Sequence, residues 1–155
     1  MTIRATCTTF IATALLTAIP ALALAQRPSK DNTPGDKTKA TETQLCAPDY
    51  ETTMKPIAGW QRSEALTRYG KRVNDETIQL DHLIPVSLGG SHDPDNLWPI
   101  PDNKEYGIAA KRELDARLHQ LVCDKTLPLK TAQDAIRKDW VKAYDEYVKG
   151  TKGSK

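Results

Sequence analysis

The 155-residue chain predicts an α+β fold, with a small β-hairpin, one helix that follows it, and flanking helices that support both. Three observations lead to this prediction. A short alternating run ends at Leu80, turn-forming residues fill positions 81–99, and apolar residues recur at helical spacing over positions 102–150. No internal repeat interrupts this order, so one mixed domain is expected.

We expect residues 1–25 to be a signal peptide that is removed on export. Residues 1–4 carry one positive charge, residues 5–22 are almost wholly apolar or small, and Ala23-Leu24-Ala25 matches a cleavage site. A membrane anchor is the alternative, but Pro20 and the small residues after it favour cleavage. No later stretch is long and apolar enough to span a membrane. The mature protein is therefore expected in the periplasm or the medium, without a membrane attachment.

The mature chain is long enough for one domain. Residues 26–44 are rich in Pro, Lys, Thr and Asp, and we expect a disordered leader there. Residues 45–150 form the predicted domain, and residues 151–155 a flexible tail. Cleavage removes Arg4 and no acidic residue, which leaves a formal charge of +1. A protein that only grips nucleic acid is usually more basic, so this charge favours a small catalytic surface without excluding a binder.

Cysteine usage agrees with export. Cys7 is lost with the signal peptide, and Cys46 and Cys123 remain. Two cysteines in an oxidising compartment most simply pair, although two free buried thiols are the alternative. Such a disulfide would stabilise the fold by about 4 kcal/mol. The spacing of the cysteines matches no zinc motif.

The first elements of the domain are short. Ser63 is expected to cap a helix that ends just before Gly70, with Glu64 in its first turn. The segment 77–80 then alternates as a strand does and leads into Asp81-His82.

The second half of the chain is expected to be helical. Asp102 and Glu105 have the spacing of a capping box, which predicts a helix from there to Cys123. A second helix is predicted to start at Thr131 and to end by Gly150.

Three residues around the predicted hairpin carry the candidate chemistry. Asp81 offers a carboxylate oxygen, which a hard divalent cation prefers, and the adjacent His82 can take a proton from water near neutral pH. Neighbours on a strand face opposite ways, so the two groups would address different atoms. Asn96 suits a structural role, because its amide can hydrogen-bond nearby backbone. An Asp that caps a turn and a structural histidine are the alternatives.

At residues 81–99, DHLIPVSLGGSHDPDNLWP, the chain resembles the HNH endonucleases, whose site is a ββα unit around one divalent cation. The likeness extends over nearly all the mature chain, to small exported bacterial HNH-type proteins, through Cys46, Tyr69-Gly70, the segment 118–123 and Asp139-Trp140. The resemblance implies a ββα-metal fold and endonuclease activity.

The resemblance also implies the ligands of the cation. Asp81 would bind it, and a second ligand is expected about nine residues after Asn96, where Glu105 stands, with Asn103 as the alternative. Mg²⁺ or Mn²⁺ is the expected metal, with Zn²⁺ or Ni²⁺ as alternatives. The family's middle Asn, here Asn96, ties the hairpin together and orients the base.

Basic residues on the following helix could bind phosphate groups. These are Lys104, Lys111 and Arg112, and a solvated helical face explains them equally well. His92 is expected to be exposed in a turn, and His119 to be structural.

These observations predict an exported, metal-dependent endonuclease with little sequence preference, acting on DNA rather than RNA. Two alternatives remain open. One is a noncatalytic relative that kept the hairpin and acts as a binding module, and the other is an exported module that recognises a partner protein through its helices. The oligomeric state is not indicated by the sequence.

Overall fold

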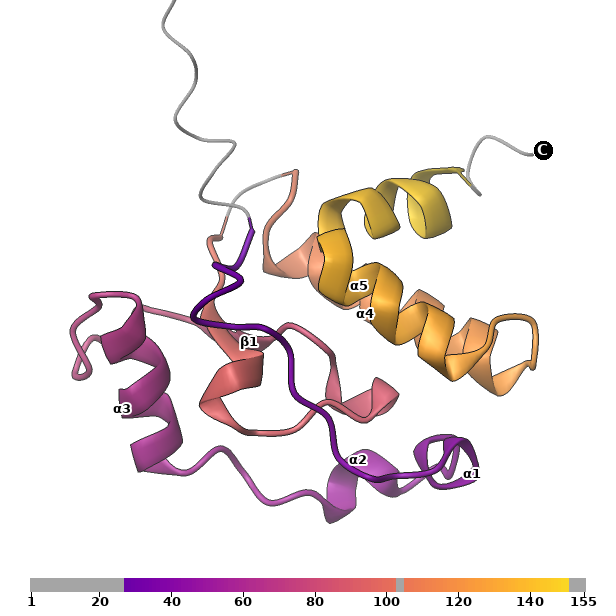
Figure 1. Cartoon of the computed structure of the whole chain (residues 1–155), viewed down its shortest axis with the longest axis horizontal. Helices are drawn as coiled ribbons and strands as arrows, with labels where there is room; N and C mark the ends of the chain where they lie inside the picture. Colours follow the sequence, from indigo (N-terminus) through magenta and orange to yellow (C-terminus); the bar gives the residue numbers. More distant parts are fainter. Residues whose placement is uncertain (1–26, 103–104, 151–155) are drawn as a thin grey trace, which may run out of the picture.

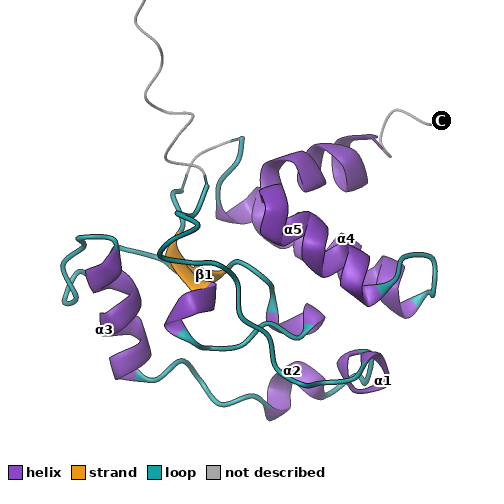
Figure 2. Ribbon diagram, viewed as in Figure 1, coloured by secondary structure: helices purple, strands orange, loops and turns teal. Residues whose placement is uncertain are grey.

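The computed structural model describes residues 27–102 and 105–150, and the predicted signal peptide and C-terminal tail lie outside them. The fold is mixed α+β, as predicted (Figures 1 and 2). No helix in the described part is both long and apolar enough to cross a bilayer. In chain order the elements are α1 (Glu42–Leu45), α2 (Tyr50–Thr53), α3 (Gly59–Arg68), β1 (Leu80–His82), η2 (Val86–Leu88), η3 (Pro94–Asn96), β2 (Leu97–Pro99), α4 (Ile108–Cys123), α5 (Leu129–Tyr144) and η4 (Asp145–Lys149).

The sheet consists of two short antiparallel strands. In its register Leu80 lies opposite Pro99, Asp81 opposite Trp98, and His82 opposite Leu97. The strand contains Asp81 and His82 themselves, whereas the prediction placed it just before them, over residues 77–80. Thr77 instead donates its backbone N–H to the Asp75 carboxylate, 3.1 Å away, so that this segment turns rather than extends.

The connection between the strands depends on two glycines. Gly89 has a φ of +82°, in the left-handed region that favours glycine. At Gly90 a Cβ atom would lie 1.7 Å from the carbonyl oxygen of Ile84, so any side chain would collide with backbone. The Gly-Gly pair therefore allows the chain to close tightly behind β1.

The helices α4 and α5 lie side by side and provide most of the core (Figure 1). Leu114 and Leu118 of α4 and Ile136 of α5 are fully buried. Trp98 of β2 and Trp140 of α5 are also buried, with ring centroids 6.3 Å apart. This contact joins the hairpin to the helical layer.

The helix starts differ from their predictions for local reasons. The helix α3 begins at Gly59 rather than at Ser63, because the Gln61 side chain caps the backbone N–H of Ala58 at 2.8 Å. The helix ends before Gly70, as expected, where φ is +61°.

The helix α5 begins at Leu129, two residues before Thr131, after Pro128 has set a φ of −60°. Its last turn continues into the π-helical segment η4, and Gly150 follows.

The helix α4 begins at Ile108, six residues after the expected cap at Asp102. Gly107 precedes it with an extended backbone, and the Glu105 carboxylate accepts a hydrogen bond from Lys149 at 3.3 Å. The predicted capping box is therefore not what starts this helix.

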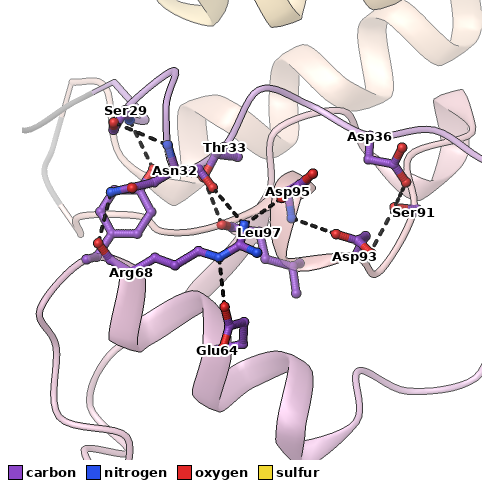
Figure 3. A network of polar contacts seen from close by, with 11 residues as sticks. Ser29, Asn32, Thr33, Asp36, Glu64, Arg68, Ser91, Asp93, Asp95 and Leu97 are labelled. Carbon is purple, nitrogen blue, oxygen red and sulfur yellow. Dashed lines mark hydrogen bonds and ion pairs between the residues drawn. The ribbon is translucent and has the colours of Figure 1, made fainter.

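The N-terminal segment, residues 27–44, packs along the hairpin loop, whereas the sequence analysis expects a disordered leader there (Figure 3). Thr33 is 1% exposed, and its hydroxyl donates to the carbonyl oxygen of Leu97 at 3.0 Å. Gly35 N–H donates to the Asp95 carbonyl at 2.8 Å, and Lys37 forms a β-bridge with Gly90. Hydrogen bonds of this kind order a polar segment that has few apolar side chains to bury.

The predicted disulfide is confirmed. Cys46 and Cys123 are joined with an S–S distance of 2.03 Å, across 77 positions of sequence. The bond ties the loop after α1 to the last turn of α4. His119, one turn before Cys123, is within hydrogen-bonding distance of the Leu45 carbonyl at 3.0 Å, a structural position of the kind expected for it.

Candidate functional site

The Asp81-His82 pair lies beside a surface cavity of about 410 Å³. Strand β1 supplies both residues. Helix α4 supplies four further lining residues, Arg112, Asp115, Ala116 and His119. The polar lining residues are Glu51, Asp81, His82, Ser87, Arg112, Asp115 and His119. The structure therefore brings three of the predicted site residues, Asp81, His82 and Arg112, to one hollow.

Lys111 lies in the interior beneath this cavity. Its side chain is 0% exposed, although it was predicted to bind phosphate. Its ammonium donates to the His82 carbonyl at 3.0 Å and to the two Asp115 carboxylate oxygens at 2.8 and 2.9 Å. It also forms an ion pair with Asp81 Oδ2 at 3.5 Å. In this position Lys111 cannot reach a phosphate group on the surface, because all of its side chain is covered.

Asp81 Oδ2 is buried and makes no hydrogen bond within the described part of the chain. The ion pair with Lys111 is its main interaction there, and at 3.5 Å it leaves the oxygen's hydrogen-bonding capacity unused. Buried polar atoms normally find a hydrogen-bond partner, so Asp81 Oδ2, whose one ion pair is 3.5 Å long, keeps the capacity for a further donor or a cation.

The charges of this cluster affect one another strongly. Burial lowers the pKa of Lys111, but the carboxylates of Asp115 and Asp81 outweigh that effect and hold it above its ordinary value. Burial raises the pKa of Asp115 to about 7, and the Lys111 ammonium opposes this rise. Two carboxyl groups thus share a single ammonium, and Asp115 takes up a proton more readily than an ordinary Asp.

His82 is paired with a second histidine that was expected to be exposed in a turn. His82 Nε2 lies 2.8 Å from His92 Nδ1, and the ring centroids are 4.9 Å apart. Burial lowers the pKa of His82 to about 4, the Asp81 carboxylate opposes the shift, and His92 and Lys111 add to it. The imidazole of His82 is therefore neutral at pH 7.

Asn96 has the structural role that the sequence analysis expects. It is 0% exposed, and its Oδ1 accepts from the Ile84 N–H at 2.9 Å. Its Nδ2 donates to the carbonyl oxygens of Ile84 and Ser91, both at 2.9 Å. These three bonds fix the backbone directly after His82.

Glu105, the expected second ligand, is not part of this cavity. Glu105 is bonded to Lys149 of η4, and its side chain is 68% exposed. Asn103 and Lys104 lie outside the described residues. Of the predicted phosphate ligands, Arg112 is thus the one that lines the cavity within the described part of the chain.

The donor set fits one hard cation that is anchored chiefly by Asp81. Asp81 Oδ2 makes no hydrogen bond and is a suitable oxygen ligand. Asp115 adds a second carboxylate nearby, but both of its oxygens already accept hydrogen bonds from Lys111.

Cys46, His119 and Cys123 also lie close together among the described residues. Both sulfur atoms belong to the disulfide, however, and this group offers no thiolate ligands in the oxidised protein.

Sequence reasoning missed Asp115 and the partnership of His92. For Asp115 a signal existed, because it follows Lys111 by four positions and such a spacing places both on one helical face. For His92 no local pattern was available, since it lies ten positions after His82, beyond η2 and the Gly-Gly turn.

Comparison with models of known protein families finds no match, and neither curated proteins nor solved structures show significant similarity to the chain.

Proposed function

We propose that this chain is an exported, metal-dependent endonuclease that hydrolyses phosphodiester bonds in nucleic acid, DNA rather than RNA, with little sequence preference. The observation that supports this most is that Asp81, whose buried Oδ2 makes no hydrogen bond and one 3.5 Å ion pair, lines one cavity together with a neutral histidine. A metal ligand and a proton acceptor are the two groups that a one-metal hydrolysis requires.

In this proposal Asp81 holds the divalent cation, Mg²⁺ or Mn²⁺, with Zn²⁺ or Ni²⁺ as alternatives. When bound, the cation supplies Lewis-acid stabilisation of the negative charge that develops on the phosphate and the leaving oxygen. Arg112, at the cavity wall, orients the substrate through a phosphate oxygen. Asn96 keeps the backbone after His82 in place.

His82 acts as the general base. Its neutral ring can accept a proton from the attacking water. His82 Nε2 lies 2.8 Å from His92 Nδ1, and the proposal takes the tautomer in which Nε2 carries the hydrogen, so that Nδ1 of His82 accepts the proton. Attack in line with the leaving 3′-oxygen then produces a 5′-phosphate end.

The test is cleavage of plasmid DNA by the mature protein with Mg²⁺ or Mn²⁺. The proposal expects metal-dependent nicking that EDTA abolishes and that His82→Ala reduces by at least about a hundredfold, the usual contribution of a general base. Thermal unfolding of His82→Ala should show a folded protein. Cleavage that persists in His82→Ala at the wild-type rate would contradict the proposal.

A second candidate function is a noncatalytic binding module with the same fold. The burial of Lys111 between Asp81 and Asp115 favours it, since an ammonium already occupies part of the space where a cation would bind. This candidate expects no cleavage with any divalent metal, and expects His82→Ala to act chiefly on stability.

A further inference from the structure

The buried ammonium of Lys111 has an effect on the site that goes beyond the proposed function. Four oxygen atoms surround it: both carboxylate oxygens of Asp115, the carbonyl oxygen of His82, and Asp81 Oδ2. Its distances of 2.8 to 3.5 Å to these atoms mean that it interacts with the same carboxylates a divalent cation would use. Lysine is almost never fully buried unless it is paired in this way.

The arrangement affects metal binding in two ways. Both oxygens of Asp115 accept hydrogen bonds from Lys111, so this carboxylate is held toward the ammonium and competes poorly as a metal ligand. The ammonium also repels any cation bound at Asp81 Oδ2, because it lies only 3.5 Å from that oxygen, in a buried environment where charges interact strongly.

We propose that Lys111 is an internal cation that weakens metal binding at Asp81, by holding Asp115 out of the ligand shell and by repelling the bound ion. The proposal rests on the proposed function, since it takes Asp81 as the metal ligand. Without substrate, the site then binds its metal weakly. A bound substrate phosphate adds negative charge, which compensates for the positive charge of Lys111 and strengthens metal binding.

The test is titration calorimetry of the folded, mature protein with Mn²⁺. In the Asp115→Asn background, where no second carboxyl can take up a proton, Lys111→Met keeps most of the side-chain volume and should bind Mn²⁺ at least about tenfold more tightly than Asp115→Asn alone, because a nearby positive charge is removed. Asp115→Asn should bind more weakly than the wild type, because it removes a negative charge. Asp81→Asn is the control for the site and should abolish the binding.

The double variant tests this point in a protein whose residue 115 carries no buried, unpaired charge. Lys111→Met alone leaves Asp115 buried and unpaired, which is costly, so its fold must be checked by thermal unfolding. The double variant Lys111→Met/Asp115→Asn leaves no such charge, and its site has the same formal charge as the wild type. It should bind Mn²⁺ more tightly than Asp115→Asn alone and about as tightly as the wild type.

The outcomes separate this inference from the proposed function. One outcome is that Mn²⁺ binding depends on Asp81 but is no tighter when Lys111 is replaced in the wild type or in Asp115→Asn. That result overturns the role of Lys111 and leaves the metal site intact. If the wild type and all Lys111 variants bind no Mn²⁺, both the inference and the metal site fail. Binding by the Lys111 variants alone would support the inference, with Lys111 as a complete barrier to the metal.

Discussion

Asn96 shows how much of the site geometry depends on one buried side chain. Its amide joins residues on both sides of the Gly-Gly turn, through Ile84 and Ser91, and its backbone carbonyl accepts from the Leu83 N–H at 2.8 Å. The structural role of this residue could be predicted from the sequence, because an Asn in a turn bonds nearby backbone. Its exact partners could not, since they lie 5 and 12 positions away.

Replacing Asn96 by Ala should lower the free energy of unfolding by about 3–5 kcal/mol, because three buried backbone groups lose their partner. Urea unfolding followed by circular dichroism would measure the change. Asn32→Ala is the matched control, since the Asn32 amide makes one bond, to the Arg68 carbonyl at 2.9 Å, in a half-buried position. Equal losses in the two variants would contradict the role of Asn96.

Two titrating residues at the site affect stability in opposite directions. The pKa of His82 falls from 6.5 to about 4 on folding, so its unfolded form takes up a proton first as the pH falls from 6.5 to 4, and stability is lost. The pKa of Asp115 rises from 3.8 to about 7, so its folded form takes up a proton first, and stability is gained as the pH falls from 7 to 3.8.

Asp115→Asn should therefore make the protein more sensitive to acid than the wild type. Without the opposing effect of Asp115, the His82 shift alone would remove about 3 kcal/mol between pH 6.5 and 4. Urea unfolding at several pH values, with EDTA present, would measure this, and His82→Gln should show a smaller loss than the wild type. If the free energy of unfolding changed with pH in the same way in the wild type and Asp115→Asn, the raised pKa of Asp115 would be contradicted.

The elements of the fold could be predicted from the sequence more readily than their boundaries. The existence of α4 and α5 follows from apolar periodicity, but their starts depend on Gly107 and Pro128, which outweigh the expected caps at Asp102 and Thr131. The burial of Lys111 could not be foreseen from periodicity, because a charged residue on a helix is normally solvated. It follows from the position of α4 against β1, where Asp81 and the His82 carbonyl meet its ammonium.

The N-terminal segment 27–41, before α1, behaves as an element without helices or strands of its own. Thr33 anchors it, because its buried hydroxyl is bonded to the Leu97 carbonyl of β2 and lies 2.8 Å from the Tyr69 hydroxyl. Arg68 adds a weaker contact to the Asn32 carbonyl at 3.4 Å (Figure 3). The segment thus covers the back of the hairpin that presents Asp81 and His82.

Thr33→Val, which keeps the shape and removes the hydroxyl, should lower the free energy of unfolding by about 1–3 kcal/mol, because the buried Leu97 carbonyl loses this donor. Limited proteolysis should also cut residues 27–38 faster than in the wild type. Thr38→Val, at a less buried position where the hydroxyl donates to Gly89 at 3.2 Å, is the control and should have a smaller effect. Unchanged proteolysis of Thr33→Val would show that other contacts hold the segment.

At the scale of the whole molecule, the disulfide connects the N-terminal part of the chain, just after α1, to helix α4, which lines the site. Cys46 lies beside Leu45, which is buried, and Cys123 ends α4, which also carries Lys111 and Asp115. The pairing could be predicted by counting, since two cysteines remain after the expected cleavage. Its place relative to the cavity could not, because that depends on how α4 packs against the hairpin.

Because the bond closes a loop of 77 positions, its loss should lower the free energy of unfolding by about 4 kcal/mol. Reduction of the wild type and the double variant Cys46→Ala/Cys123→Ala should give similar losses in thermal or urea unfolding. Reductant added to the double variant is the control and should change nothing. Because the constraint acts mainly on the unfolded chain, the folded variant should keep the hairpin and its metal affinity at temperatures well below its unfolding midpoint. An unchanged stability on reduction would mean that core packing alone holds α4 against the hairpin.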